Sequence, residues 1–147
     1  MRIRFSLAWL KSSQLVGKSF KSPAAYSLFK EYTNRLSHFL SCEVGTYPSK
    51  NKTCIWVCER EKTGKPVSSE SLAQELQRCM NSGVQELQIV IGGSDGFTTQ
   101  ELEKMGPAFR WSFGPLTLPH ELAAVVAAEQ MYRALTILRH MPYHVGH

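Results

Sequence analysis

The sequence predicts an α/β fold in which a mainly parallel sheet is flanked by helices. Short runs rich in β-branched and aromatic residues alternate with longer segments whose apolar residues recur at helical spacing. Strands that alternate with helices are joined by crossovers, and crossovers place neighbouring strands parallel. A chain of 147 residues is long enough for one well-packed core and short for two. We therefore expect residues 1–147 to form a single domain.

The N-terminal third contains two predicted strands separated by a helix. Residues 3–10, IRFSLAWL, are expected to form the first strand, and residues 41–48, SCEVGTYP, the second, which Pro48 ends. Between them, residues 22–40 have the apolar spacing of a helix. The apolar positions of this helix are Tyr26, Phe29, Tyr32, Leu36 and Phe39.

Two buried strands are predicted in the middle of the chain. Residues 54–59, CIWVCE, and residues 86–93, ELQIVIGG, are dense in β-branched or aromatic residues. Cys54 and Cys58 share one face of the first of these strands, and burial in the core is the favoured explanation for both. The tryptophans of the predicted strands are also expected in the core: Trp9, Trp56 and Trp111.

Two further helices have recognisable starts. Residues 68–83 are predicted to be helical, with Ser68 or Ser69 as the N-cap. Residues 98–101, TTQE, have the pattern of a capping box, in which a Thr and a Glu three residues later satisfy each other's backbone N–H groups. The short helix that follows is expected to end at Gly106.

The last strand and the last helix complete the predicted fold. Residues 109–118, FRWSFGPLTL, are expected to form a strand with a turn inside it, followed by a helix over residues 119–138. The helix has one apolar stripe and further apolar residues on a second face. The stripe consists of Ala124, Val125, Ala128, Met131, Tyr132, Leu135 and Leu138, and the second face of Val126, Ala127 and Ile137. Because apolar residues cover more than one face, we expect a subunit interface here.

The charge is concentrated in the N-terminal part. Residues 1–53 hold nine Lys/Arg and two Glu, a net charge of +7, whereas residues 54–147 hold eight Lys/Arg and ten Asp/Glu, a net charge of −2. A basic region on a small protein suits a polyanionic partner such as RNA. A solvated basic surface without a partner fits the charge equally well.

Other classes of protein are disfavoured by the sequence. The apolar runs are too short to span a bilayer, and the N-terminus lacks the cleavage site of a secretion signal. The four cysteines form no CxxC pair, so reduced thiols and a cytoplasmic location are expected. His140, His144 and His147 crowd the C-terminus, but no Asp, Glu or Cys lies beside them, and no metal site is expected.

Two glycine-containing bends are the candidate ligand sites. Residues 89–97, IVIGGSDGF, leave a strand through glycines that permit close backbone approach, yet match neither the dinucleotide nor the P-loop pattern. Residues 113–121, FGPLTLPHE, surround exposed backbone groups with apolar side chains, an arrangement that suits an adenine base. A tight turn and a strand-to-helix corner, neither with a ligand, also explain these bends. His120 is either catalytic or a polar residue of the first helical turn.

Three motifs together resemble a known family. The motifs are IVIGGSDGF, WSFGPLTLPHELAAVVAAEQMYRAL and PYH, and in this order and spacing they resemble the bacterial ribosomal RNA large subunit methyltransferase H family of the SPOUT class. The likeness is dense from about Leu87 to His144. It implies a homodimer, no membrane association, and a C-terminal trefoil knot around S-adenosyl-L-methionine. It also implies methylation of N3 of a pseudouridine in helix 69 of 23S rRNA within the assembled ribosome.

The resemblance also implies roles for individual residues. The implied cofactor-binding residues are Cys58, Gly93, Gly114, Pro115, Leu116, Thr117, Leu118 and Pro119. The implied catalytic candidates are His120, Arg133, Tyr143 and His144, of which the last two are expected to reach the site of the other subunit. Two alternatives stay open: a dimer that binds cofactor and ribosome without turnover, and a knotted methyltransferase with another RNA target. The first alternative, a dimer without turnover, is motivated by the short segment before residue 54 and by the tail MPYHVGH.

Overall fold

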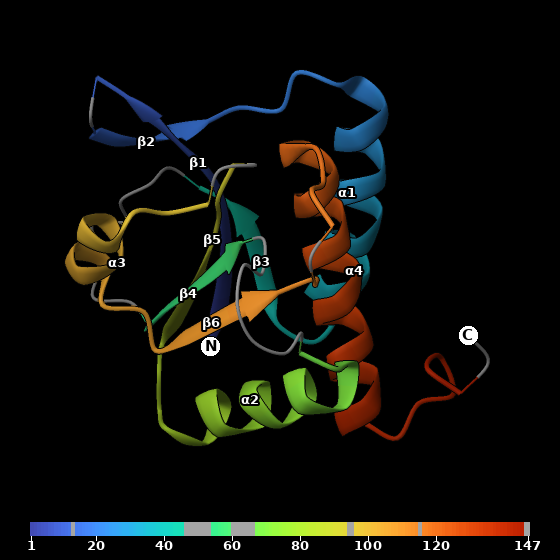
Figure 1. The fold of residues 1–147 in the computed structure, drawn as a ribbon. Helices are drawn as coiled ribbons and strands as arrows, with labels where there is room; N and C mark the ends of the chain where they lie inside the picture. Colours follow the sequence, from blue (N-terminus) through green and yellow to red (C-terminus); the bar gives the residue numbers. More distant parts are fainter. Residues whose placement is uncertain (13, 46–53, 60–66, 94–95, 115, 146–147) are drawn as a thin grey trace.

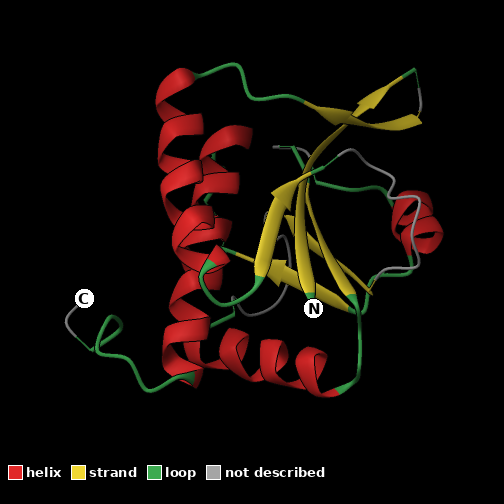
Figure 2. Ribbon diagram, turned by 180° about the vertical axis from the view of Figure 1, so that it is seen from behind, coloured by secondary structure: helices red, strands yellow, loops and turns green. Residues whose placement is uncertain are grey.

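The protein is described by a computed structural model in which one sheet lies between helices on its two sides (Figures 1 and 2). The described residues are 1–12, 14–45, 54–59, 67–93, 96–114 and 116–145. Figure 2 shows α3 on one side of the sheet and the longer α1 and α4 on the other. The prediction of an α/β fold is therefore confirmed.

In the described part of the chain, six strands form the sheet. They are β1 (Arg2–Lys11), β2 (Gln14–Lys18), β3 (Ser41–Val44), β4 (Cys54–Glu59), β5 (Glu86–Ile91) and β6 (Phe109–Ser112). The order is β2-β1-β5-β4-β6, and β3 also pairs with β1. All pairs are parallel except the β1–β2 hairpin. The sheet is thus mainly parallel, as predicted.

The helices begin where the sequence supplies capping residues. They are α1 (Pro23–Ser37), α2 (Ser69–Asn81), α3 (Thr99–Met105) and α4 (His120–Leu138). Ser68, rather than Ser69, caps α2 by accepting a hydrogen bond from the backbone N–H of Ser71. Thr98 and Glu101 form the predicted capping box of α3, and Gly106 ends this helix at a φ of 57°. These local predictions are confirmed.

The central strand β5 is buried along its whole length. Each of its six residues is buried, because β1 and β4 pair with its edges and the two cores cover its faces. Leu87, Ile89 and Ile91 belong to the larger core under α1, α2 and α4. Val90 belongs to the smaller core under α3. At the start of the strand, the carboxylate of Glu86 pairs with Arg4 at 2.8 Å.

Helix α4 is buried by other parts of the same chain. It packs against α1 and α2 and contacts β1 and β5. Its buried residues are Ala123, Ala124, Val125, Ala127, Ala128, Met131, Ala134, Leu135 and Thr136. These intramolecular contacts bury most of the apolar stripe and Ala127, whereas Val126 and Ile137 of the second face are half-buried. The subunit interface stays a prediction.

Three sequence expectations need correction. Strand β2 was not predicted, because its five residues carry no strong alternation. The last strand ends at Ser112 instead of continuing to residue 118, because Gly114 turns the backbone at a φ of 98°. Trp9 is 44% exposed, unlike the buried Trp56 and Trp111, since it lies in the part of β1 that extends past β5 and pairs with β2.

Among the described residues, no helix has the length and apolar character needed to cross a lipid bilayer.

The burial of α2 predicts a clear difference between two leucine truncations. We expect Leu76→Ala to lower the free energy of unfolding by about 2–5 kcal/mol, because the side chain is fully buried and its loss leaves a cavity. The matched change Leu28→Ala, at a position that is 41% exposed on α1, should cost much less. Urea denaturation of both variants measures this, and equal losses would contradict the described packing.

Candidate active site

Three parallel strands end at the same edge of the sheet and bring two bends together. Cys58 near the end of β4 is in register with Ile91 at the end of β5 and with Trp111 of β6. The ladder continues one step further, since the N–H of Gly92 donates to the carbonyl of Cys58 at 2.9 Å. Because the carboxyl ends of parallel strands share one edge, the loops that follow them leave side by side.

A narrow cleft lies between these loops. Its lining residues are Cys58, Glu59, Gly92, Gly93, Phe113, Leu116, Thr117, Leu118 and Ala123. Five residues that the sequence suggested as cofactor contacts border it: Cys58, Gly93, Leu116, Thr117 and Leu118. Gly114 and Pro119 belong to the same loop, where Gly114 is held by a hydrogen bond to Ser112 Oγ at 3.0 Å and Pro119 is the N-cap of α4. Pro115 lies outside the described residues.

The cleft is small in the described conformation. Its volume is about 20 Å³, little more than one water-sized probe requires, whereas ligand pockets hold roughly 300–1,000 Å³. A nucleotide-sized ligand therefore needs a wider cleft, which an outward shift of the loop residues 116–118 would give. Leu116 of this loop is 70% exposed, so its displacement breaks little packing.

Glu59 is a part of the cleft that sequence reasoning missed. Its carboxylate accepts a hydrogen bond from the N–H of Phe97 at 3.2 Å and pairs with Arg110 of β6. Glu59 thus links the segment after the glycine turn to the neighbouring strand. Its position directly after Cys58, where a buried strand ends, was the available signal.

Cys58 contributes its backbone rather than a reactive thiol. Complete burial raises the pKa of the thiol well above its ordinary value, and the neighbouring carboxylate of Glu59 raises it further. A protonated, buried thiol is a poor nucleophile. The polar group that Cys58 contributes is therefore its backbone carbonyl, which accepts the hydrogen bond from the N–H of Gly92.

His120 stands at the start of α4 and is tied to the end of β5. Its Nε2 lies 2.6 Å from the carbonyl oxygen of Ile91. A carbonyl only accepts, so Nε2 carries the proton, and in the neutral ring Nδ1 is then an acceptor. Burial lowers the pKa of His120, and the nearby Lys18 lowers it further, against the opposing effects of the Ile91 bond and Glu121. The ring is therefore neutral at pH 7 and holds a free basic nitrogen.

The other three catalytic candidates form a cluster at the opposite end of α4. Arg133 Nη1 lies 3.1 Å from Nδ1 of His144, and the guanidinium of Arg133 lies 4.9 Å from the centre of the Tyr143 ring. His144 Nε2 lies 2.8 Å from the carboxylate of Glu70 on α2, a bond that lowers the pKa of Glu70. We call Glu70, Arg133, Tyr143 and His144 the tail cluster.

A single chain does not bring His120 and the tail cluster together. Arg133 lies thirteen positions after His120 along α4, and at 1.5 Å per residue this is about 20 Å. Figure 1 shows the tail leaving the end of α4 beside α2, away from the start of the helix. The four catalytic candidates thus occupy two places within one chain, because Arg133 lies beside Tyr143 and His144, the two residues expected at the other subunit's site, and not beside His120.

No metal centre is formed by the residues that the structure describes, because no three His, Cys, Asp or Glu side chains are grouped in a way that could hold an ion.

The fold and the cleft define a class of protein. A parallel sheet with two convergent bends beyond its strand ends, flanked by a neutral histidine, is an arrangement that suits a nucleotide-like ligand. The sequence model described as "Predicted SPOUT methyltransferase" matches residues 48–144, which include the cleft, α4 and the tail cluster. The chain belongs to the SPOUT methyltransferase family.

Three relatives show how similar the chain is to individual named proteins. The chain is 38% identical over 142 residues to the ribosomal RNA large subunit methyltransferase H of Koribacter versatilis, covering 90% of this chain and 95% of that protein. It is 41% identical over 103 residues to the protein of that name from a Psychrobacter species, covering 70% of this chain and 60% of the relative. With the protein of that name from Magnetococcus marinus, identity is 43% over 90 residues, 61% of this chain and 55% of the relative. The resemblance found in the motifs is thereby confirmed.

The environment of His120 predicts its titration. We expect an NMR titration to give its imidazole a pKa below 6.5, because burial disfavours the charged ring. The unfolded chain then binds more protons, so the folding stability that this group contributes is present above pH 6.5 and falls as the pH drops through the folded pKa. His120→Gln assigns the resonance and should weaken this loss of stability between pH 7 and pH 5. A pKa of 6.5 or higher would contradict the described burial.

Proposed function

We propose that the protein is an S-adenosyl-L-methionine-dependent methyltransferase that modifies RNA of the large ribosomal subunit. The observation that carries the proposal is the convergence of the glycine turn at Gly93 and the bend at Leu116–Leu118 around the end of β4, in a chain of the SPOUT methyltransferase family. The relatives named ribosomal RNA large subunit methyltransferase H support the choice of ribosomal RNA. As the finer target we propose N3 of a pseudouridine in helix 69 of 23S rRNA within the assembled ribosome.

The lining of the cleft fits the proposed cofactor. A side chain added at Gly93 would meet nothing within 4 Å, so the space beside this backbone is free for a ligand. Phe113 and Leu118 offer apolar surface to an adenine ring, and backbone groups of the same loop offer hydrogen bonds to its edge. When bound, the cofactor supplies an activated methyl group on a sulfonium. We infer that its contacts are Cys58, Gly93 and residues 114–119, the knotted region of the proposed fold.

The acceptor nitrogen needs a group that takes its proton. N3 of a pseudouridine is an imide nitrogen, and it becomes a nucleophile when it loses its proton. In our proposal the free Nδ1 of neutral His120 is the candidate acceptor, because Nε2 is already committed to Ile91. The cationic Arg133 is the candidate for stabilising the anionic base.

A homodimer resolves the separation of the two sets of residues. We infer that the tail cluster of one copy, with Arg133, Tyr143 and His144, lies beside His120 and the cleft of the other. The separation of about 20 Å along α4 supports this inference, since no bending of the tail moves Arg133 within its own helix. We further propose that the dimer works in the cytoplasm, where its free thiols stay reduced.

Non-catalytic binding of cofactor and ribosome is the second candidate function. The short segment before residue 54 and the tail MPYHVGH support it, because both depart from the pattern of the family that the chain resembles. A methyltransferase with another RNA target is the remaining alternative, and mapping of the methylated nucleotide separates it from our proposal.

Gly93 provides a direct test of the cofactor site. We expect Gly93→Val to abolish binding of S-adenosyl-L-methionine while the fold persists, because the new side chain enters open space that the ligand needs. Gly93→Ala should weaken binding less, and Lys104→Gln on the exposed side of α3 should leave it unchanged. Calorimetry measures the affinities and circular dichroism checks the fold. Wild-type affinity in Gly93→Val would remove Gly93 from the site.

Methyl transfer to ribosomes tests the reaction and the dimer together. With labelled cofactor and ribosomes that lack the modification, we expect label in helix 69, and none for His120→Ala or His144→Ala alone. An equal mixture of these two variants should regain about a quarter of the activity, because half of the dimers are mixed and each mixed dimer has one intact site.

The failures of this experiment have different meanings. If the two groups act within one chain, every site in the mixed dimers keeps one defect and no activity returns. Label elsewhere in the RNA would identify another target. Cofactor binding without any label would favour the non-catalytic function.

A further inference from the structure

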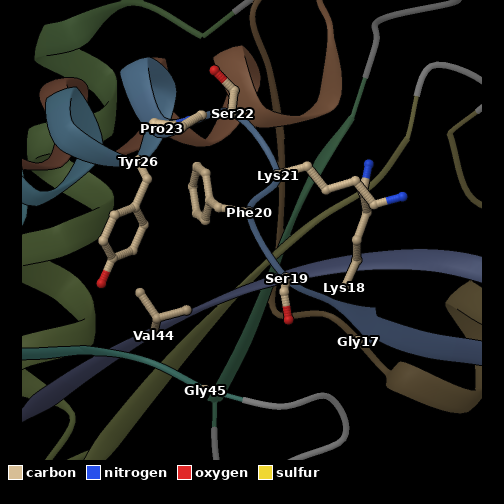
Figure 3. A pocket seen from close by; sticks show the side chains of 10 residues that line it. All are labelled: Gly17, Lys18, Ser19, Phe20, Lys21, Ser22, Pro23, Tyr26, Val44 and Gly45. Carbon is tan, nitrogen blue, oxygen red and sulfur yellow. The ribbon is translucent and has the colours of Figure 1, made fainter.

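A second pocket is formed by residues of the N-terminal part of the chain, beside the carboxyl end of β3. Its volume is about 640 Å³, within the range of roughly 300–1,000 Å³ that small-ligand sites occupy. It is lined by residues 17–23, from the end of β2 to the start of α1, by Tyr26 of α1, and by Val44 and Gly45 at the end of β3 (Figure 3). We call it the hairpin pocket.

One side of the hairpin pocket is aromatic and apolar. The rings of Phe20 and Tyr26 lie 5.5 Å apart in an edge-to-face arrangement, and Phe20 is held in place by Phe29 at 5.0 Å. Tyr26 is 45% exposed and Val44 is 44% exposed, so both offer free apolar surface. Figure 3 shows Phe20, Tyr26 and Val44 around the hollow. A flat ring would gain contact with all three side chains.

The other side of the pocket is basic. Lys18 and Lys21 extend to the side away from Tyr26 in Figure 3, and Lys18 Nζ lies 5.5 Å from the Trp9 ring. The nearby carboxylate of Glu121 accepts hydrogen bonds from the backbone N–H groups of Lys21 and Ser22, both at 2.9 Å. The first turn of α1 contains no acidic residue. An anion at this rim meets two lysines, while the Glu121 carboxylate already accepts from the N–H groups directly before α1.

The hairpin pocket lies next to the proposed base. Phe20 and Val44 also border a small gap that reaches Ile91, whose carbonyl oxygen binds His120. Lys18 is close enough to His120 to lower its pKa. The pocket therefore lies on the β1 and β3 side of His120, while the cleft lies on the β4 and β6 side.

We propose that the hairpin pocket binds one unpaired nucleotide of an RNA strand, with its base against Tyr26 and Phe20 and its phosphate near Lys18 and Lys21. The proposal rests on the RNA substrate proposed above. Aromatic platforms beside basic groups hold single-stranded nucleic acid because every base has a face to stack and every nucleotide has a charged phosphate. An apolar peptide would use only the aromatic side of the pocket, whereas a polyanion also matches the net charge of +7 over residues 1–53.

Photo-crosslinking and binding measurements on the full-length protein test the proposal. The probe is a short oligouridylate with a single 4-thiouridine, and we expect its crosslink to map to the peptide that contains Phe20 and Tyr26. Tyr26→Ala should weaken the affinity for this probe about tenfold, because one stacking surface is lost. Tyr26→Phe keeps the ring and should bind as the wild type does. Leu28→Ala is the matched truncation, at a similarly exposed position of α1 that does not line the pocket.

The lysines supply a second, independent readout. Lys21→Gln should weaken binding and reduce the salt dependence of the affinity by about one released ion. Lys104→Gln, an exposed lysine of α3, is the charge-matched control and should change neither. Affinity of both Tyr26→Ala and Lys21→Gln within about twofold of wild type would overturn the proposal, since stacking and phosphate contacts cost more than that.

The remaining outcomes separate this inference from the proposed function. A crosslink that maps elsewhere, or a change of oligomeric state in Tyr26→Ala, would overturn it and assign the pocket to another role or to a second copy of the chain. If the protein binds no methyl donor but crosslinks at Tyr26, the pocket is supported and the methyltransferase proposal fails. If methyl transfer proceeds and Tyr26→Ala is as active as wild type at limiting RNA, the pocket assignment fails alone.

Discussion

Complete burial of β5 is the constraint on which the rest of the structure depends. A strand with all six residues buried needs a neighbour at each edge and a layer on each face, and β1, β4 and the two cores supply them. The buried carboxylate of Glu86 at its start is compensated by Arg4. Its other end is also held by hydrogen bonds, since the N–H of Gly92 donates to Cys58 and the carbonyl of Ile91 accepts from His120.

The held end of β5 organises the chemistry around it. On one side it donates to Cys58 and so keeps the glycine turn against the end of β4. On the other it accepts from His120, which fixes the start of α4 and the protonated nitrogen of the ring. The cleft, the neutral histidine and the hairpin pocket are thus arranged around one strand end. A glycine turn that followed a less buried strand would not be held in one position in this way.

Helix α4 separates the two groups of polar residues that our proposal assigns to one reaction. Its packing against α1 and α2 makes it a rigid spacer, with His120 at one end and the tail cluster at the other. Within one chain this geometry divides the candidate residues. In our proposal a second copy of the chain resolves this separation, with the tail cluster of one copy beside His120 of the other.

The sequence by itself determined what depends on local spacing and capping. Helix starts at Ser68 and Thr98, the helical end at Gly106, the core positions of Trp56 and Trp111, and the two bends were all readable, because neighbouring residues cause them. The tertiary structure decided what depends on distant residues. It exposed Trp9 where β1 extends past β5, placed Glu59 in the cleft, and set His144 beside Glu70. Residues far apart along the chain meet only after the sheet has formed, and no local pattern encodes those distances.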